Sequence, residues 1–139
     1  MSTPGRLILR AHVFLLAGVI PLLVRVLPLK GLLRLLTPPE RVRPYRGASA
    51  REIASAVRGR LRRPRHMRRR RCLREGLLLF HFLCLSGRSA VLRVGVYAGA
   101  GGRSRAHCWV TLDGESVSAP PDGPVAEVLT HARPGAAAG

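Results

Sequence analysis

The chain has 139 residues, the length of a single domain with one modest core. Hydrophobic residues make up 47% of it and aromatic residues 4%, which excludes a disordered chain and requires a core built mainly from leucine, valine and alanine. The formal net charge of +17 is extreme and is typical of proteins that meet nucleic acid, an anionic membrane surface or an acidic partner.

Two observations weaken a nucleic-acid function. Lys30 is the only lysine, so the charge is almost all arginine and, with the abundant alanine, glycine and proline, partly reflects GC-rich coding. The arginines are also not interleaved with the aromatic residues that stack on bases. The three cysteines lack CxxC spacing, which predicts a reducing compartment, no disulfide framework and no zinc or other metal, and we expect no cofactor.

Residues 1–36 form an apolar and basic segment. Residues 13–24 carry no charge, but this run is short of the roughly 20 residues that cross a bilayer. Pro21 and Pro28 interrupt the pattern further. We therefore expect kinked amphipathic helices that pack on the rest of the domain, with contact to a membrane face as the alternative.

The predicted core covers residues 37–132 and begins with a connecting loop over 37–47. Ser49 is a candidate N-cap, and Glu52 three positions later completes a capping box. The helix that follows should run to about Arg62. Its apolar positions recur at helical spacing: Ile53, Ala56, Val57 and Leu61.

Ten arginines lie between Arg58 and Arg74. One interpretation is a solvated helix end followed by a loop. The other is an anion-facing rim beside Cys72 that attracts an acidic peptide or lowers the pKa of the thiol. The sequence favours neither.

A second helix is predicted from Cys72 to about Ser86, with Gly87 as its C′ residue. Its apolar face is wide, which indicates a central, buried helix, and His81 and Cys84 on that face are interpreted as core residues. Cys72 stands at the helix start, where the helix dipole, the unpaired amides and the neighbouring guanidinium groups favour a thiolate.

Strands follow this helix. Residues 90–97 and His107–Leu112 read as strands joined by a flexible glycine-rich hairpin loop, and Asp113-Gly114 is a tight turn that returns the chain over 115–117. Residues 125–131 are assigned a short helical turn, and 133–139 a disordered tail. The class is α+β: N-terminal helices, a central helix starting at Cys72 and a small antiparallel sheet.

Cys72 and His107 are a candidate nucleophile and base, and such a pair needs a third group that orients the imidazole. The hairpin register places Ala119 opposite either Cys108 or His107, and no carboxylate lies nearby. Asp113 is at the turn tip, too far along the strand. Asp122 is the remaining candidate. The backbone amide of Cys72 is a candidate oxyanion-hole donor.

These residues resemble the leader peptidases of lasso-peptide biosynthesis, the small B-type proteins with a transglutaminase-like cysteine-protease fold, in their split form. The resemblance rests on four fragments in order: Arg71-Cys72-Leu73, Val94-Gly95-Val96, Ala106-His107-Cys108-Trp109-Val110 and Leu112-Asp113-Gly114. It covers residues 70–118 specifically and the N-terminal half loosely.

The resemblance implies proteolysis of a ribosomally made precursor, with Cys72 as nucleophile and His107 as general base and acid. It also implies three partners: the leader of the precursor, a small leader-recognition protein, and an ATP-dependent cyclase that closes the macrolactam. We expect the protein in the cytoplasm, with membrane association as an alternative. The third catalytic residue of the family, an Asp, falls at Ala119 here, and Cys108 replaces the usual Ala.

Two other functions remain open. One is a catalytically weakened relative that presents the precursor to the cyclase. The other is a basic module that binds a membrane or nucleic acid, with the Cys/His order accidental.

Overall fold

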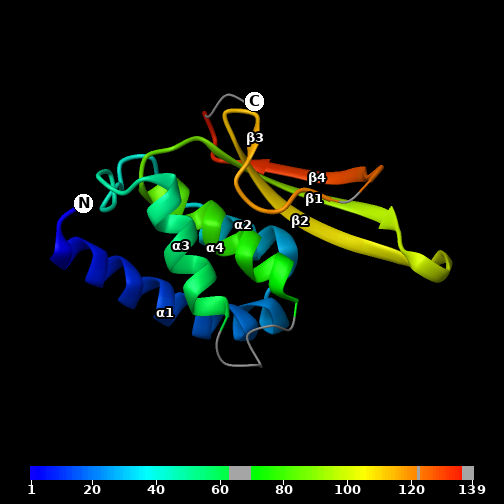
Figure 1. Ribbon diagram of the computed structural model, residues 1–139, viewed down its shortest axis with the longest axis horizontal. Helices are drawn as coiled ribbons and strands as arrows, with labels where there is room; N and C mark the ends of the chain where they lie inside the picture. Colours follow the sequence, from blue (N-terminus) through cyan, green and yellow to red (C-terminus); the bar gives the residue numbers. More distant parts are fainter. Residues whose placement is uncertain (63–69, 122, 136–139) are drawn as a thin grey trace.

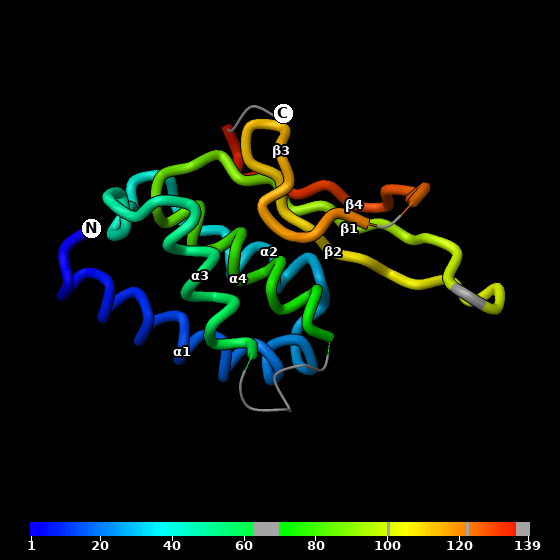
Figure 2. Tube along the Cα trace, in the orientation of Figure 1, coloured from blue at the N-terminus to red at the C-terminus, as the bar shows by residue number. Residues whose placement is uncertain are grey.

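The computed structural model describes residues 1–62, 70–121 and 123–135. Four helices lie on one side of a four-stranded antiparallel sheet, and the β1–β2 hairpin projects beyond the helices (Figures 1 and 2). This arrangement confirms the predicted α+β class. The helices are α1 (Thr3–Val26), α2 (Leu29–Leu36), α3 (Ala50–Leu61) and α4 (Arg71–Leu85), and the strands are β1 (Ala90–Ala98), β2 (Ser104–Leu112), β3 (Glu115–Ser116) and β4 (Ala126–Ala132).

The N-terminal segment forms two helices, but only one of the two predicted breaks is present. Pro28 is the N-cap of α2, as expected. The break expected at Pro21 is wrong, because α1 continues through this residue to Val26. A proline inside a helix removes one backbone hydrogen bond, and here the neighbouring Ala17 and Ile20 are buried in the core, which offsets that loss.

Helix α3 begins with the predicted capping box. The Glu52 amide donates to the Ser49 hydroxyl at 3.1 Å, and the Ser49 amide donates to the Glu52 carboxylate at 2.9 Å. Because the carboxylate accepts this backbone bond, the pKa of Glu52 is lowered, and the nearby Arg6 adds to the effect. The helix then buries Ile53, Ala54, Val57 and Leu61.

Helix α4 is the centre of the fold, packed against α3 on one side and β2 on the other. Its residues 76–80 and 82–85 are all buried. Gly87, at φ +86°, ends the helix as predicted: its amide donates to the Cys84 carbonyl, and the Arg88 amide donates to the Leu83 carbonyl. His81 is a partnered residue of this helix, with Nδ1 2.8 Å from the Leu36 carbonyl.

The sheet has the order β3-β2-β1-β4. The β1–β2 connection through a short 3-10 turn, η2 (Ala100–Gly102), confirms the predicted hairpin loop. Asp113 and Gly114 have φ of +52° and +82°, the conformation of a two-residue turn, and Leu112 pairs with Glu115 across it. This register continues outward, since the Val117 amide donates to the Val110 carbonyl.

The C-terminal region differs from the sequence prediction. Residues 126–132 form β4, which pairs with the free edge of β1, so the helical turn assigned to 125–131 is wrong. The hydrophobic periodicity of so short a segment does not distinguish a helix from a strand. The segment becomes a strand because the edge of β1 offers unpaired amides and carbonyls with which it can form hydrogen bonds. Arg133, assigned to the tail, is 7% exposed and lies 3.4 Å from the Cys84 carbonyl. Residues 136–139 lie outside the described residues.

Candidate active site

Cys72 lies in the first turn of α4 and is half-buried. The residue before the helix, Arg70, has φ of +50°, so the chain turns sharply into the segment that carries the thiol. The other two cysteines are buried, and burial raises the pKa of Cys84 to about 11 and that of Cys108 to about 12. Cys72 is therefore the thiol that a substrate can reach.

Cys108 lies against α4 one turn after Cys72. A Cβ added to Gly76 would come within 2.5 Å of the Cys108 sulfur, so α4 and β2 approach closely at this point. Burial is the larger cause of the raised pKa of Cys108, and the charge of Cys72 also contributes. The two sulfurs are thus within electrostatic reach of each other.

His107 is oriented by the main chain. Its Nε2 lies 2.9 Å from the carbonyl oxygen of Ala119. A carbonyl only accepts hydrogen bonds, so Nε2 carries the proton and Nδ1 holds the lone pair of a base. The ring also stacks on Trp109, with 5.9 Å between centroids, and meets the edge of Tyr97.

The thiol and the imidazole do not meet in this structure. Consecutive residues of a strand point to opposite faces, and Cys108 points toward α4. His107 therefore faces the other side of the sheet, together with Trp109. Within residues 1–62, 70–121 and 123–135, no hydrogen bond joins Cys72 to His107.

The resemblance predicts an Asp at position 119, and in the structure the main-chain carbonyl of Ala119 is the group that contacts the imidazole. Of the two registers considered for the hairpin, the structure has the one with a two-residue turn at Asp113-Gly114. Continued from the Thr111–Ser116 pair, this register places Ala119 opposite Cys108. Asp122 lies outside the described residues, so its predicted role stays a prediction.

Sequence reasoning missed the contacts that hold this segment beside α4. Arg58 of α3 donates from Nη2 to the Val117 carbonyl at 2.7 Å and from Nε to Glu75 at 3.0 Å. The Ser118 hydroxyl accepts from the Val110 amide at 2.9 Å. Arg58 thus links α3, α4 and the segment that carries the Ala119 carbonyl. No spacing rule relates residues so far apart in the chain.

A cavity of about 270 Å³ opens between the end of α1 and the start of α4, and Cys72 is not among the residues that line it. None of the described residues that line it is acidic. Burial lowers the pKa of Arg74, and the charge of the nearby Arg70 adds to this effect. The lining residues are Pro21, Val24, Arg25, Arg70, Leu73 and Arg74.

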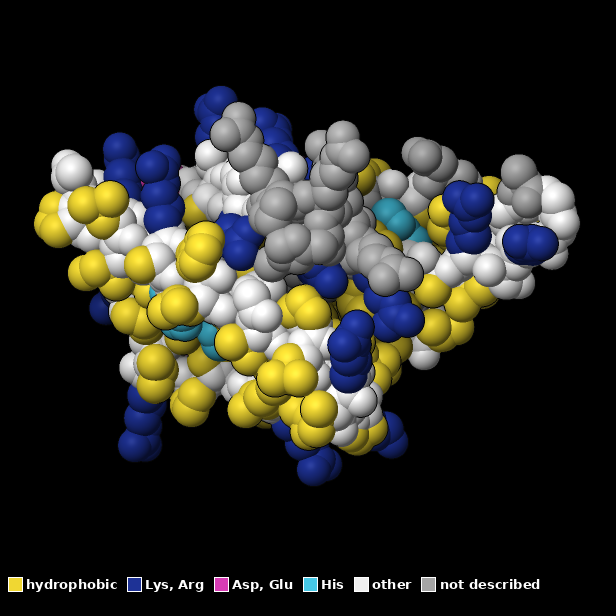
Figure 3. All heavy atoms as spheres, turned by 90° about the horizontal axis from the view of Figure 1, so that it is seen from below, with side chains coloured by type: hydrophobic (Ala, Val, Ile, Leu, Met, Phe, Trp, Pro, Cys, Tyr) yellow, Lys and Arg dark blue, Asp and Glu magenta, His cyan; other side chains and the backbone are white. Residues whose placement is uncertain are grey.

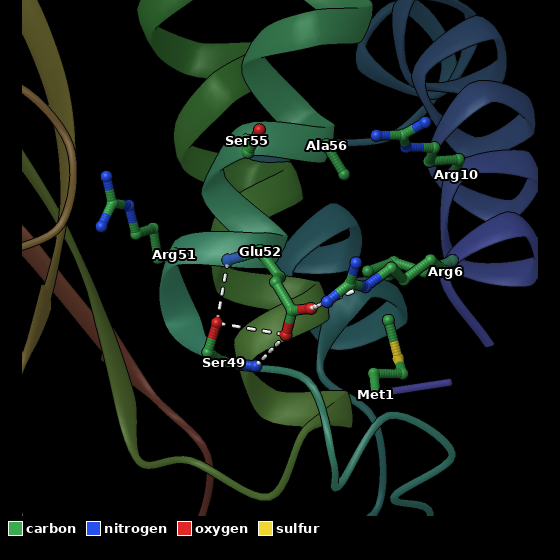
Figure 4. Close-up of a pocket in the computed structure, with 9 residues that line it drawn as sticks. Met1, Arg6, Arg10, Ser49, Arg51, Glu52, Ser55 and Ala56 are labelled. Atoms are coloured by element: carbon green, nitrogen blue, oxygen red, sulfur yellow. Dashed lines mark hydrogen bonds and ion pairs between the residues drawn. The ribbon is translucent and has the colours of Figure 1, made fainter. Parts of the chain in front are cut away.

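A second cavity, of about 290 Å³, lies between the starts of α1 and α3 (Figure 4). Figure 4 shows Glu52 at its wall, bound to Ser49 and to Arg6, whose Nη2 is 2.9 Å from the carboxylate. Neither Cys72 nor His107 lines it. In the part of the chain that the structure describes, no three His, Cys, Asp or Glu side chains form a group able to hold a metal.

Comparison with known proteins gives one result. A family model described as the transglutaminase-like superfamily matches residues 14–129, a span that runs from α1 into β4 and contains both Cys72 and His107. No curated protein and no solved structure matches the chain.

Proposed function

Because the chain belongs to the transglutaminase-like superfamily, we propose that it is a cysteine peptidase that removes the leader from a ribosomally synthesised lasso-peptide precursor. The fold is compatible with a cysteine protease. The finer assignment is supported by the fragments that flank Cys72 and His107. In this proposal a small recognition protein delivers the leader, and an ATP-dependent cyclase then closes the macrolactam.

The reaction uses one thiol and one imidazole. The Cys72 thiol gives its proton to Nδ1 of His107 and attacks the scissile carbonyl, forming a tetrahedral intermediate whose oxyanion accepts from the Cys72 amide. His107 returns the proton to the leaving amine, and the C–N bond breaks. Water then hydrolyses the thioester with His107 as base, which releases the acid and regenerates the thiol.

The observation that carries the proposal is the contact between His107 Nε2 and the Ala119 carbonyl. It gives the imidazole the tautomer that a general base needs, without a carboxylate. Because His107 faces away from α4 in this structure, the proposal requires that substrate binding turn the imidazole toward the thiol so that Nδ1 reaches it.

The test is leader release, followed by mass spectrometry, with a lasso-peptide precursor and a recognition protein that are to be sought among the neighbouring genes. Cys72→Ala and His107→Ala should abolish cleavage, while the matched control Cys84→Ala retains it in protein shown to be folded. Undiminished cleavage by Cys72→Ala would sink the peptidase assignment. Asp122→Ala should slow the reaction only if Asp122 supplies the third group.

The separation of Cys72 from His107 favours a second candidate, a weakened relative that presents the precursor to the cyclase. This function predicts no leader release by the wild-type chain, while the complete set of proteins still requires the chain for product. Cys72→Ala would then support product formation as well as the wild type does.

A further inference from the structure

The exposed apolar side chains of this protein are concentrated at its N-terminus. Among the described residues, all the exposed large apolar side chains except Val42 and Val128 lie on α1 and α2. In the view from below, apolar side chains cover much of the surface, with basic groups around them (Figure 3). On α1 they are Leu7, Ile8, Phe14, Leu15, Val19, Leu22 and Val26, which we call the apolar face.

The apolar face is one side of one helix. Ile8, Leu15 and Leu22 recur every seven residues, which is close to two helical turns, so they lie in a row along α1. The opposite side of α1 is buried in the core through Leu9, Val13, Ala17 and Ile20. The core therefore explains why one side of α1 is apolar, but it does not explain why the exposed side is apolar too.

The charges around the apolar face all have one sign. Residues 1–36 contain no aspartate or glutamate. Arg25 on α1 and Lys30 and Arg34 on α2 are exposed, and α2 also exposes Leu29 and Leu35. Long basic side chains lay their methylene stems along apolar surface and extend their charges to its border.

From this combination we propose that the apolar face of α1 lies in the interfacial layer of an anionic membrane, with the basic groups of α1 and α2 on lipid phosphates. A second copy of the chain is a poorer occupant, since pairing two such faces would bring Arg25, Lys30 and Arg34 of both copies together. By length and composition α1 could also cross a bilayer. Crossing would remove its buried side from the core, whereas lying in the interface preserves the fold.

Vesicle flotation tests the proposal with vesicles of phosphatidylcholine alone and of phosphatidylcholine mixed equally with phosphatidylglycerol. Wild-type protein should float with the mixed vesicles. Leu22→Glu should reduce binding by more than about tenfold, because it places a charge in the apolar layer. The matched control is Val128→Glu on β4, since both side chains are 62% exposed. This control should bind like the wild type.

A second arm tests the charges. Arg25→Gln should weaken binding to the mixed vesicles by about fivefold, the contribution of one basic group at an anionic surface, whereas the exposed loop variant Arg41→Gln should have a smaller effect. Equal losses for Leu22→Glu and Val128→Glu would overturn the proposal, since binding would then reflect net charge alone. Absence of flotation would overturn it too, and a dimer in light scattering that Leu22→Glu dissolves would assign the face to a second copy. None of these outcomes depends on peptidase activity.

Discussion

Helices α1 and α4 are both rich in leucine, yet they have different surroundings. Helix α4 lies between the other helices and the sheet, and its residues from Gly76 to Phe80 are buried without interruption. Helix α1 buries Leu9, Val13, Ala17 and Ile20 on one side and exposes large apolar side chains on the opposite side. Apolar composition alone therefore does not show whether a helix belongs to a core. A helix belongs to the core when other elements pack against it on all sides.

The difference also describes the surroundings of the candidate nucleophile. Cys72 is at the exposed start of the buried helix, where a rigid element holds the thiol and the solvent reaches it. The C-terminal end of α1 reaches the start of α4 at the cavity that Arg25 and Arg70 both line. Four experiments test the comparison between α1 and α4.

The largest difference should come from shortening one leucine in each helix. Leu78→Ala in α4 removes a fully buried side chain and should lower the free energy of unfolding by about 2–5 kcal/mol. Leu15→Ala in α1, where the side chain is 66% exposed, should change it by less than about 0.5 kcal/mol. Denaturant titration measures both. If the two variants lost similar amounts of unfolding free energy, the exposed side of α1 would have to be covered in solution.

Two glycines offer a closer comparison. Gly76→Ala puts a methyl group against the Cys108 sulfur and should cost about 1–3 kcal/mol. Gly18→Ala in α1 meets nothing within 4 Å and should stabilise the protein by up to about 1 kcal/mol through helix propensity. Both are measured as midpoints of denaturation. Cys108→Ala should rescue Gly76→Ala, and failure of that rescue would contradict the close α4–β2 contact.

Acid should loosen the attachment of α1 and α2 to α4. His12 of α1 and His81 of α4 have ring centroids 6.0 Å apart, and burial lowers the pKa of both, with the charge of His12 adding to the effect on His81. A lowered pKa in the folded state means that this stability is present above about pH 6.5 and is lost as the pH falls through the folded-state value.

The measurement is the free energy of unfolding between neutral and mildly acidic pH. His81→Gln should show a shallower decline with acid than the wild type. An unchanged slope would show that other groups bind the protons.

The smallest effect should appear in the rate at which Cys72 is alkylated by charged and neutral reagents. The arginines around the start of α4 should favour the anionic reagent iodoacetate over neutral iodoacetamide. Arg74→Gln should lower this ratio of alkylation rates by about two- to fivefold, the effect of one partly solvated charge. Mass spectrometry locates the label, and Arg41→Gln provides a control of equal net charge. A ratio that falls equally in both variants would show a general effect of net charge.

The parts of the fold that the sequence predicted are those that neighbouring residues determine. Ser49 and Glu52 form the N-terminal cap of α3 from within one turn, Gly87 ends α4, and Asp113-Gly114 forms a turn that fixes its own register. Strand β4 was missed because a strand edge distant in the chain decides its conformation. The continuation of α1 through Pro21 likewise depends on packing in the core.

The site follows the same division. The sequence predicted Cys72 and His107 as catalytic residues, and these roles stay predictions. It did not identify which strand residue faces α4, although Gly76 was a usable signal, since a glycine on an apolar helix face often marks a close approach. The link from Arg58 to the Val117 carbonyl joins three segments and has no local signature.

The carbonyl that holds His107 belongs to the main chain, and this affects how the protein can evolve. Pro120 restricts Ala119 to an extended backbone, so a different side chain at position 119 leaves the oxygen where it is. Substitutions at position 119 can thus introduce or remove an acidic side chain while the hydrogen bond between the imidazole and the main-chain carbonyl is kept. An insertion in the Asp113-Gly114 turn is the more damaging change, because it displaces the whole returning segment and the imidazole loses its support at once.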